Sequence, residues 1–138
     1  MFLKKSLTGL TAVACDAAEA ARTLEFTPAD GMDQARSIGF GYSFTPAAAG
    51  TTVITVVLYK SGDGGTTWIR VPAWSFADAG KYTGANYSQE VTLTAAGTFW
   101  VDCEMENANA VKAVFSTDTA DAADEMDCSV CYGYEKRG

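Results

Sequence analysis

The sequence contains no histidine. This absence removes the side chain that most often serves as a general base near neutral pH, together with Ser–His and Cys–His nucleophile pairs and the commonest metal ligand. A carboxylate pair remains as a catalytic candidate, but most of the 17 acidic residues fall in expected turns or at outward strand positions. We therefore expect a protein that is not an enzyme and that needs no cofactor and no metal.

Basic residues and long apolar runs are also scarce. The chain has 10 Lys and Arg residues against 17 Asp and Glu residues, a net charge of −7, and so lacks the basic surface that grips nucleic-acid phosphates. No stretch approaches the roughly 20 consecutive apolar residues of a membrane-spanning helix. We expect neither nucleic acid nor membrane as a partner.

The amino terminus has the outline of a secretion leader that ends near Cys15. Thr8, Gly9 and Thr11 dilute its apolar segment, and alternating residues from Leu7 to Cys15 can share one strand face. We therefore predict a first strand over residues 6–15. A secreted or lipid-anchored protein is the less favoured alternative.

The sequence does contain a repeated β-strand pattern. Residues 37–44 alternate bulky side chains with Ser and Gly, and a period of two recurs in residues 22–27, 87–94, 98–104, 111–115 and 126–134. We predict about eight strands and almost no helix, hence an all-β fold: an antiparallel β-sandwich of the jelly-roll or a related Greek-key type. The length of 138 residues favours one domain spanning 1–138.

The strongest local signal runs from residue 51 to residue 71: an apolar strand, a Gly/Asp turn, and a second strand opened by Trp68. The turn matches the pattern S-x-D-x-G-x-T-W, the Asp-box of sialidases and other β-proteins, at Ser61, Asp63, Gly65, Thr67 and Trp68. That resemblance implies a structural turn. We expect Asp63 to accept hydrogen bonds from turn N–H groups, and a calcium site is disfavoured because only one carboxylate is evident.

The strand before this turn is largely apolar on both faces: one face has Val53, Thr55, Val57 and Tyr59, and the other has Ile54, Val56 and Leu58. Such a strand needs cover on both sides. The amino-terminal segment, residues 74–76 or a neighbouring subunit are the candidates for that cover.

Two further groups of residues are candidates for binding. Cys128 and Cys131 form a CxxC, but residues i and i+3 of a strand point to opposite faces, so a zinc site that adds Cys15 and Cys103 is disfavoured and the bonding state of the thiols stays open. A second group, which flanks Gly80, Gly84 and Asn86 in an expected loop, consists of Trp74, Tyr82 and Tyr87. They are candidates for glycan or partner contact, and the alternative is that Trp74 plugs one end of the sandwich.

The order of these features resembles small β-sandwich virion proteins of tailed bacteriophages, most clearly in VVLYKSGDGGTTWIRV (56–71) and AVFSTDTADAADEMDCSVCYGY (113–134). The resemblance implies a non-enzymatic structural protein located in the virion and assembled in the host cytoplasm. A capsid decoration or cement protein is favoured, with the major capsid protein or other virion proteins as partners and a homo-oligomer, for example a trimer, as its state. A neck or tail adaptor and a glycan-binding or host-attachment module are the alternatives.

Overall fold

The computed structural model describes residues 2–45, 52–71, 73–77, 81–86, 89–93, 97–118 and 124–135. These residues form eleven strands and two short 3-10 helices, η1 (Glu19–Arg22) and η2 (Pro28–Asp30). The strands are β1 (Phe2–Ala14), β2 (Thr23–Phe26), β3 (Ala35–Thr45), β4 (Thr52–Ser61), β5 (Ile69–Arg70), β6 (Ala73–Ala77), β7 (Lys81–Asn86), β8 (Gln89–Leu93), β9 (Gly97–Glu104), β10 (Ala110–Asp118) and β11 (Glu125–Glu135).

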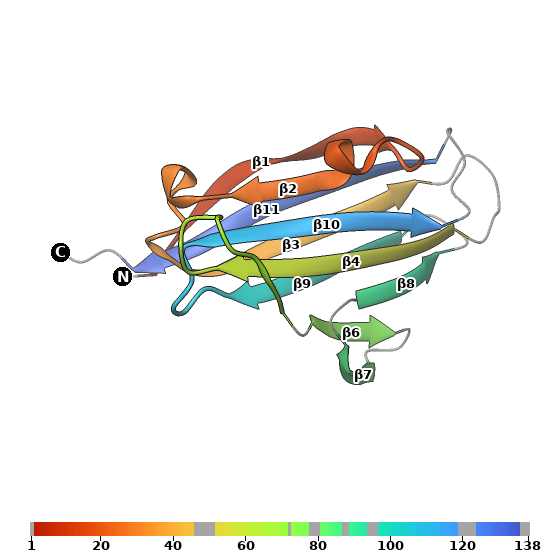
Figure 1. Ribbon diagram of the computed structural model, residues 1–138. Coiled ribbons are helices and arrows are strands. Elements are labelled where there is room, and N and C mark those ends of the chain that lie inside the picture. The colour runs from red at the N-terminus through yellow and green to blue at the C-terminus, as the bar shows by residue number, and fades with distance from the viewer. Residues whose placement is uncertain are drawn as a thin grey trace.

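Two antiparallel sheets form the body of the molecule (Figure 1). The first has the order β1-β11-β3-β9, and the second has the order β2-β10-β4 with β5 and β8 both paired to β4. A separate two-stranded sheet joins β6 and β7. The predicted antiparallel β-sandwich is therefore confirmed.

The pairing follows a simple rule. Strand β1 pairs with β11, β2 with β10, β3 with β9 and β4 with β8, so the chain is one long two-stranded ribbon rolled into two sheets. Successive ribbon pairs alternate between the sheets, which is the jelly-roll arrangement. The segment that holds β5, β6 and β7 interrupts the tip of this ribbon, between β4 and β8.

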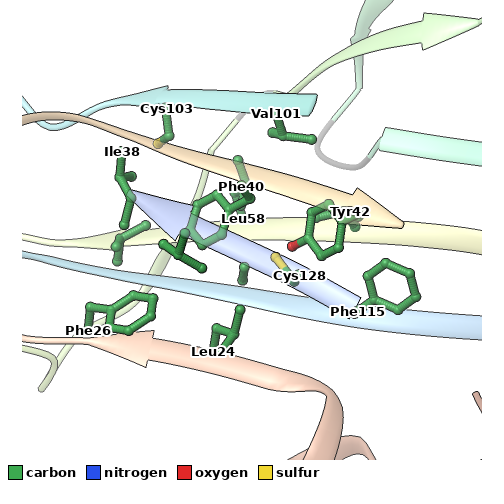
Figure 2. Packing of buried hydrophobic residues seen from close by; sticks show 14 of the residues in the cluster. Leu24, Phe26, Ile38, Phe40, Tyr42, Leu58, Val101, Cys103, Phe115 and Cys128 are labelled. Carbon is green, nitrogen blue, oxygen red and sulfur yellow. The ribbon is translucent and has the colours of Figure 1, made fainter. Parts of the chain in front are cut away.

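The core lies between the two sheets (Figure 2). Period-two alternation turns one side of each strand inward, so β3 contributes Ile38, Phe40, Tyr42 and Phe44, all at most 2% exposed. The opposite sheet supplies Leu24, Phe26, Val56, Leu58, Val111, Ala113 and Phe115. Each large side chain buried in this way stabilises the fold by roughly 1.5–3 kcal/mol relative to an exposed position.

Tyr42 is the one aromatic side chain in this cluster whose hydroxyl is buried without a hydrogen bond among the described residues. Figure 2 shows the hydroxyl beside the sulfur of Cys128. Burial, with the neighbouring Cys128 thiol, raises the pKa of Tyr42 well above its usual value. The ring itself packs on Phe99 and Phe115, with centroids 5.0 Å away in each case.

The first strand differs from its prediction. It begins at Phe2 and ends at Ala14, and two register shifts against β11 fall between Leu7 and Leu10 and between Leu10 and Val13. The residues that pack on the core are therefore Leu7, Leu10 and Val13, three apart instead of two. Each shift inserts an extra residue, which reverses the alternation of faces.

Two other local predictions were wrong. The second strand of the central hairpin is only β5, two residues long, and the predicted loop 72–81 contains β6. Strand β4 obtains its long partners from β10 and β8 instead, so tertiary pairing replaces the local hairpin.

Candidate interaction surface

The turn after β4 is held by a compact set of hydrogen bonds. The Ser61 hydroxyl donates to Asp63 Oδ1 at 2.6 Å and accepts from the Gly65 N–H at 2.9 Å. Asp63 Oδ1 also accepts from the Thr67 N–H at 2.8 Å. Gly64 and Gly65 have φ angles of +76° and +101°, a region that L side chains rarely adopt.

These bonds lower the pKa of Asp63 from its usual 3.8 to about 2. The Ser61 hydroxyl is the largest cause, followed by the Thr67 N–H. Both groups donate to the ionised form and so favour it. The Asp63 carboxylate accepts hydrogen bonds from its own turn, and these bonds close the loop.

The turn is also joined to the loop between β9 and β10. The Asn109 side-chain oxygen accepts from the Gly64 N–H at 2.8 Å, and the Asn109 N–H donates to the Ser61 carbonyl at 2.9 Å. Two loops far apart in the sequence therefore close the same end of the sandwich.

The outer side of the β4 sheet carries a continuous row of half-buried side chains. Val57 lies opposite Val114 of β10, and Tyr59 lies opposite Lys112. Thr55, Val57, Tyr59, Lys112, Val114 and Trp68 are all neither fully buried nor fully exposed. On the inner side of the same strand Val56 and Leu58 are 0% and 1% exposed. We call the outer row, Val57, Tyr59, Trp68, Lys112 and Val114, the β4–β10 outer face.

A lysine packs on the aromatic part of the β4–β10 outer face. The Lys112 ammonium lies 4.8 Å from the ring centroid of Tyr59 and 4.8 Å from that of Trp68. Such contacts contribute roughly 0.5–1 kcal/mol each at exposed sites. Trp68, which the turn motif singles out, thus belongs to the sheet surface as well as to the turn.

The other aromatic candidates have a different location. Trp74 lies in β6, opposite Ala85, and Tyr82 lies in β7, opposite Phe76. Both strands belong to the two-stranded sheet at the interrupted tip of the ribbon (Figure 1). Tyr87 lies outside the described residues.

The CxxC behaves as strand geometry requires. Cys128 points into the core at 3% exposure, and Cys131 lies on the outer side of the same strand. Burial raises the pKa of the Cys128 thiol to about 12. Within the described residues, no three His, Cys, Asp or Glu side chains gather where they would hold a metal ion.

Sequence reasoning missed one surface residue, Trp100. It lies on the outer side of β9 and is 48% exposed. The register places it opposite Gly41 of β3. The available signal was the bare face of residues 37–43 combined with an outward tryptophan, but only strand pairing brings the two together.

No helix among the described residues reaches the length and apolar character needed to cross a membrane.

No family model matches the chain. No curated protein matches it either. Among solved structures, the SPBc2 prophage-derived protein YomS is similar over 96% of this chain and 95% of its own, with a TM-score of 0.56 and 11% identity. The xylan-binding CBM22-1 domain of Paenibacillus barcinonensis Xyn10C covers 97% of this chain and 87% of its own length at a TM-score of 0.48 and 13% identity. The structure of infectious bursal disease virus strain Gx is similar over 96% of this chain and 32% of its own chain, with a TM-score of 0.49 and 12% identity. At these identities the likeness to YomS shows a shared fold.

Proposed function

We propose that this protein is a non-enzymatic structural protein of a tailed-bacteriophage virion. In its finer form the proposal is a capsid decoration or cement protein that stabilises the shell through protein–protein contacts, as a homo-oligomer and on the major capsid protein. Two findings support the broader role: the sequence resembles such virion proteins, and the fold is shared with YomS, whose name gives it a prophage origin.

The β4–β10 outer face is the observation that carries the proposal. Val57 and Val114 lie side by side in the middle of the sheet, and Tyr59 and Trp68 continue the apolar row toward the end of β4. Neighbours in their own sheet cover these side chains only in part. A protein partner that covers them gains the free energy of removing apolar surface from water.

The area that a stable interface must bury indicates how much of the sheet surface the partner covers. Specific interfaces bury about 800 Å² on each side, more than a few side chains supply. The contact therefore extends from the central row over β2, where Glu25 is exposed opposite Lys112, and over β5 at Arg70. A mixed rim of this kind around an apolar centre is typical of interfaces between subunits.

The test is a charge placed in the centre of the row. Val57→Glu should weaken binding to shells of the major capsid protein by about tenfold or more, because a carboxylate in the centre of the contact loses its hydration when the partner covers it. Co-sedimentation with assembled shells measures binding, and size-exclusion chromatography with light scattering measures the oligomeric state. The wild-type protein should bind shells and form an oligomer.

Two variants serve as controls. Ile69→Glu places the same charge on a side chain that is 69% exposed and lies opposite Lys60, off the row, so shell binding should not change. Val57→Thr keeps the shape and should bind nearly as well as the wild type. A wild-type monomer without affinity for shells would refute the proposal, and so would a Val57→Glu variant that folds and binds normally.

A further inference from the structure

A large aromatic ring lies on the outer side of the β1-β11-β3-β9 sheet. Trp100 is 48% exposed, and it lies on the sheet opposite to the β4–β10 outer face. The other large apolar side chain exposed among the described residues, Ile69, lies at a strand edge next to the turn. Trp100 belongs to β9, the edge strand of its sheet, and its only partner strand among the described residues is β3.

The ring lies on a floor of two glycines. A Cβ atom built on Gly39 would lie 2.2 Å from Trp100 Cζ2, and one built on Gly41 would lie 2.8 Å from Trp100 Cζ3. Any side chain at either position would push the indole off the sheet. The two glycines thus leave room for the ring to lie across β3, with one face against the backbone and the other toward solvent.

A hydrogen bond fixes the ring in its plane. The indole Nε1–H of Trp100 donates to Asp102 Oδ1 at 2.8 Å. Asp102 is the next outward residue on the same strand and is exposed. A side chain that is already fixed loses little conformational entropy when a ligand packs on it. The Trp100 indole is therefore preorganised for stacking.

The surroundings of the ring are small and polar. The outward neighbours on β3, β9 and β11 carry hydroxyl, thiol and carboxylate groups and no large apolar side chain: Ser37, Ser43, Thr98, Asp102, Glu104, Ser129 and Cys131. A protein partner stacked here would find no apolar rim to cover. A ligand with an apolar face and many hydroxyl groups could stack on the indole ring and form hydrogen bonds with the polar side chains around it.

We propose that this surface binds a neutral saccharide, with a pyranose ring stacked on the exposed face of Trp100. The C–H groups of one pyranose face lie against the indole, and the hydroxyls at the ring edge bond to the Asp102 carboxylate and the Ser129 hydroxyl. The carboxylates of Asp102 and Glu104 and the net charge of −7 repel anionic sugars. The proposal does not depend on the proposed virion role.

The experiment is isothermal titration calorimetry of the full chain with cellohexaose, xylohexaose, maltohexaose and chitohexaose. At least one of these neutral oligosaccharides should bind with a Kd below about 1 mM. Trp100→Ala should weaken that binding by about tenfold or more, the size of a lost aromatic stacking contact. Trp100→Phe, which keeps a flat ring, should recover most of the affinity.

A second variant tests the glycine floor without touching the saccharide. Gly41→Ala should tip the indole and weaken binding while Trp100 remains present, and thermal unfolding will show whether the variant is folded. Ile69→Ala is the matched control and should bind like the wild type. Failure of all four oligosaccharides to bind would overturn the proposal. Unchanged binding by Trp100→Ala would also overturn it, as would a Trp100→Ala variant whose only defect is a changed oligomeric state.

Discussion

Hydrogen bonds between neighbouring residues hold the conformation of the turn after β4. Ser61 acts as both donor and acceptor: its hydroxyl donates to Asp63 and accepts from the Gly65 N–H, and this side chain is only 2% exposed. All the partners lie within a few residues of one another, so the sequence motif alone predicts that Asp63 accepts bonds from the turn. The link to Asn109, by contrast, requires the fold to bring two loops together.

The first prediction concerns the charge state of Asp63. Its pKa of about 2 in the folded protein lies below the usual 3.8, so the ionised carboxylate stabilises the fold at neutral pH. That contribution is complete above pH 3.8 and is lost as the pH falls toward 2. Asp63→Asn should therefore be less stable than the wild type at pH 7, and the difference should disappear in acid. Urea unfolding at several pH values measures it.

A second variant identifies the cause. Ser61→Ala removes the largest contribution to the shift, so the Asp63 pKa should move upward toward 3.8. An NMR titration of the side-chain carboxyl reports this value directly. An Asp63 that titrates at its usual pKa in the wild type would contradict the hydrogen-bonded turn.

At the scale of elements, β1 shows what strand pairing does to a sequence pattern. Alternation predicts Leu7, Gly9, Thr11, Val13 and Cys15 on one face, whereas the two bulges place Leu7, Leu10 and Val13 on the core. Ala12 adopts a φ of +47°, and its N–H bonds to the Asp127 side chain instead of a ladder carbonyl. A bulge depends on the partner strand, so the pattern of β1 alone does not reveal it.

The second prediction tests the close approach of β1 to β11. A Cβ atom on Gly9 would lie 1.7 Å from the Cys128 carbonyl oxygen, which is backbone and has little freedom to move. Gly9→Ala should therefore lower the free energy of unfolding by about 1–3 kcal/mol, the range for overpacked positions. Urea denaturation at neutral pH provides the measurement.

The matched control is the exposed neighbour Thr8. Thr8→Ala should change stability by less than about 0.5 kcal/mol, as surface substitutions usually do. Equal stability of the Gly9→Ala and Thr8→Ala variants would show that β1 does not approach β11 as closely as described.

At the scale of the whole molecule, the sandwich buries three of the four cysteines and leaves the fourth partly exposed to solvent. Cys15, Cys103 and Cys128 are buried, and Cys131 is only partly covered. Burial, with the nearby Asp124, raises the pKa of Cys15 to about 11, and burial raises that of Cys128 to about 12. Since the thiolate is the reactive form, the interior cysteines should be inert.

The third prediction follows from this separation. Iodoacetamide at mildly alkaline pH should modify the folded protein rapidly at Cys131 alone, whereas the unfolded chain should take up label at all 4 cysteines. Intact-mass spectrometry over time counts the additions. Cys131→Ser should remove the fast addition, and simultaneous labelling of every cysteine in the folded protein would argue against the buried positions.

Short-range patterns in the sequence predict the fold class, most strand positions and the turn at Ser61–Trp68. Alternation, β-branched runs and Gly/Asp turns act over a few residues, and such signals are readable in one dimension. The opposite directions of Cys128 and Cys131 follow from the same period and were predicted correctly.

Contacts between distant segments set which strands pair and which side chains their outer faces present. Pairing between distant segments placed Gly41 of β3 beneath Trp100 of β9 and Val57 of β4 beside Val114 of β10. The same pairing reduced the expected hairpin partner to the two residues of β5. Sheet order and register arise from long-range burial, and no short window of sequence contains that information.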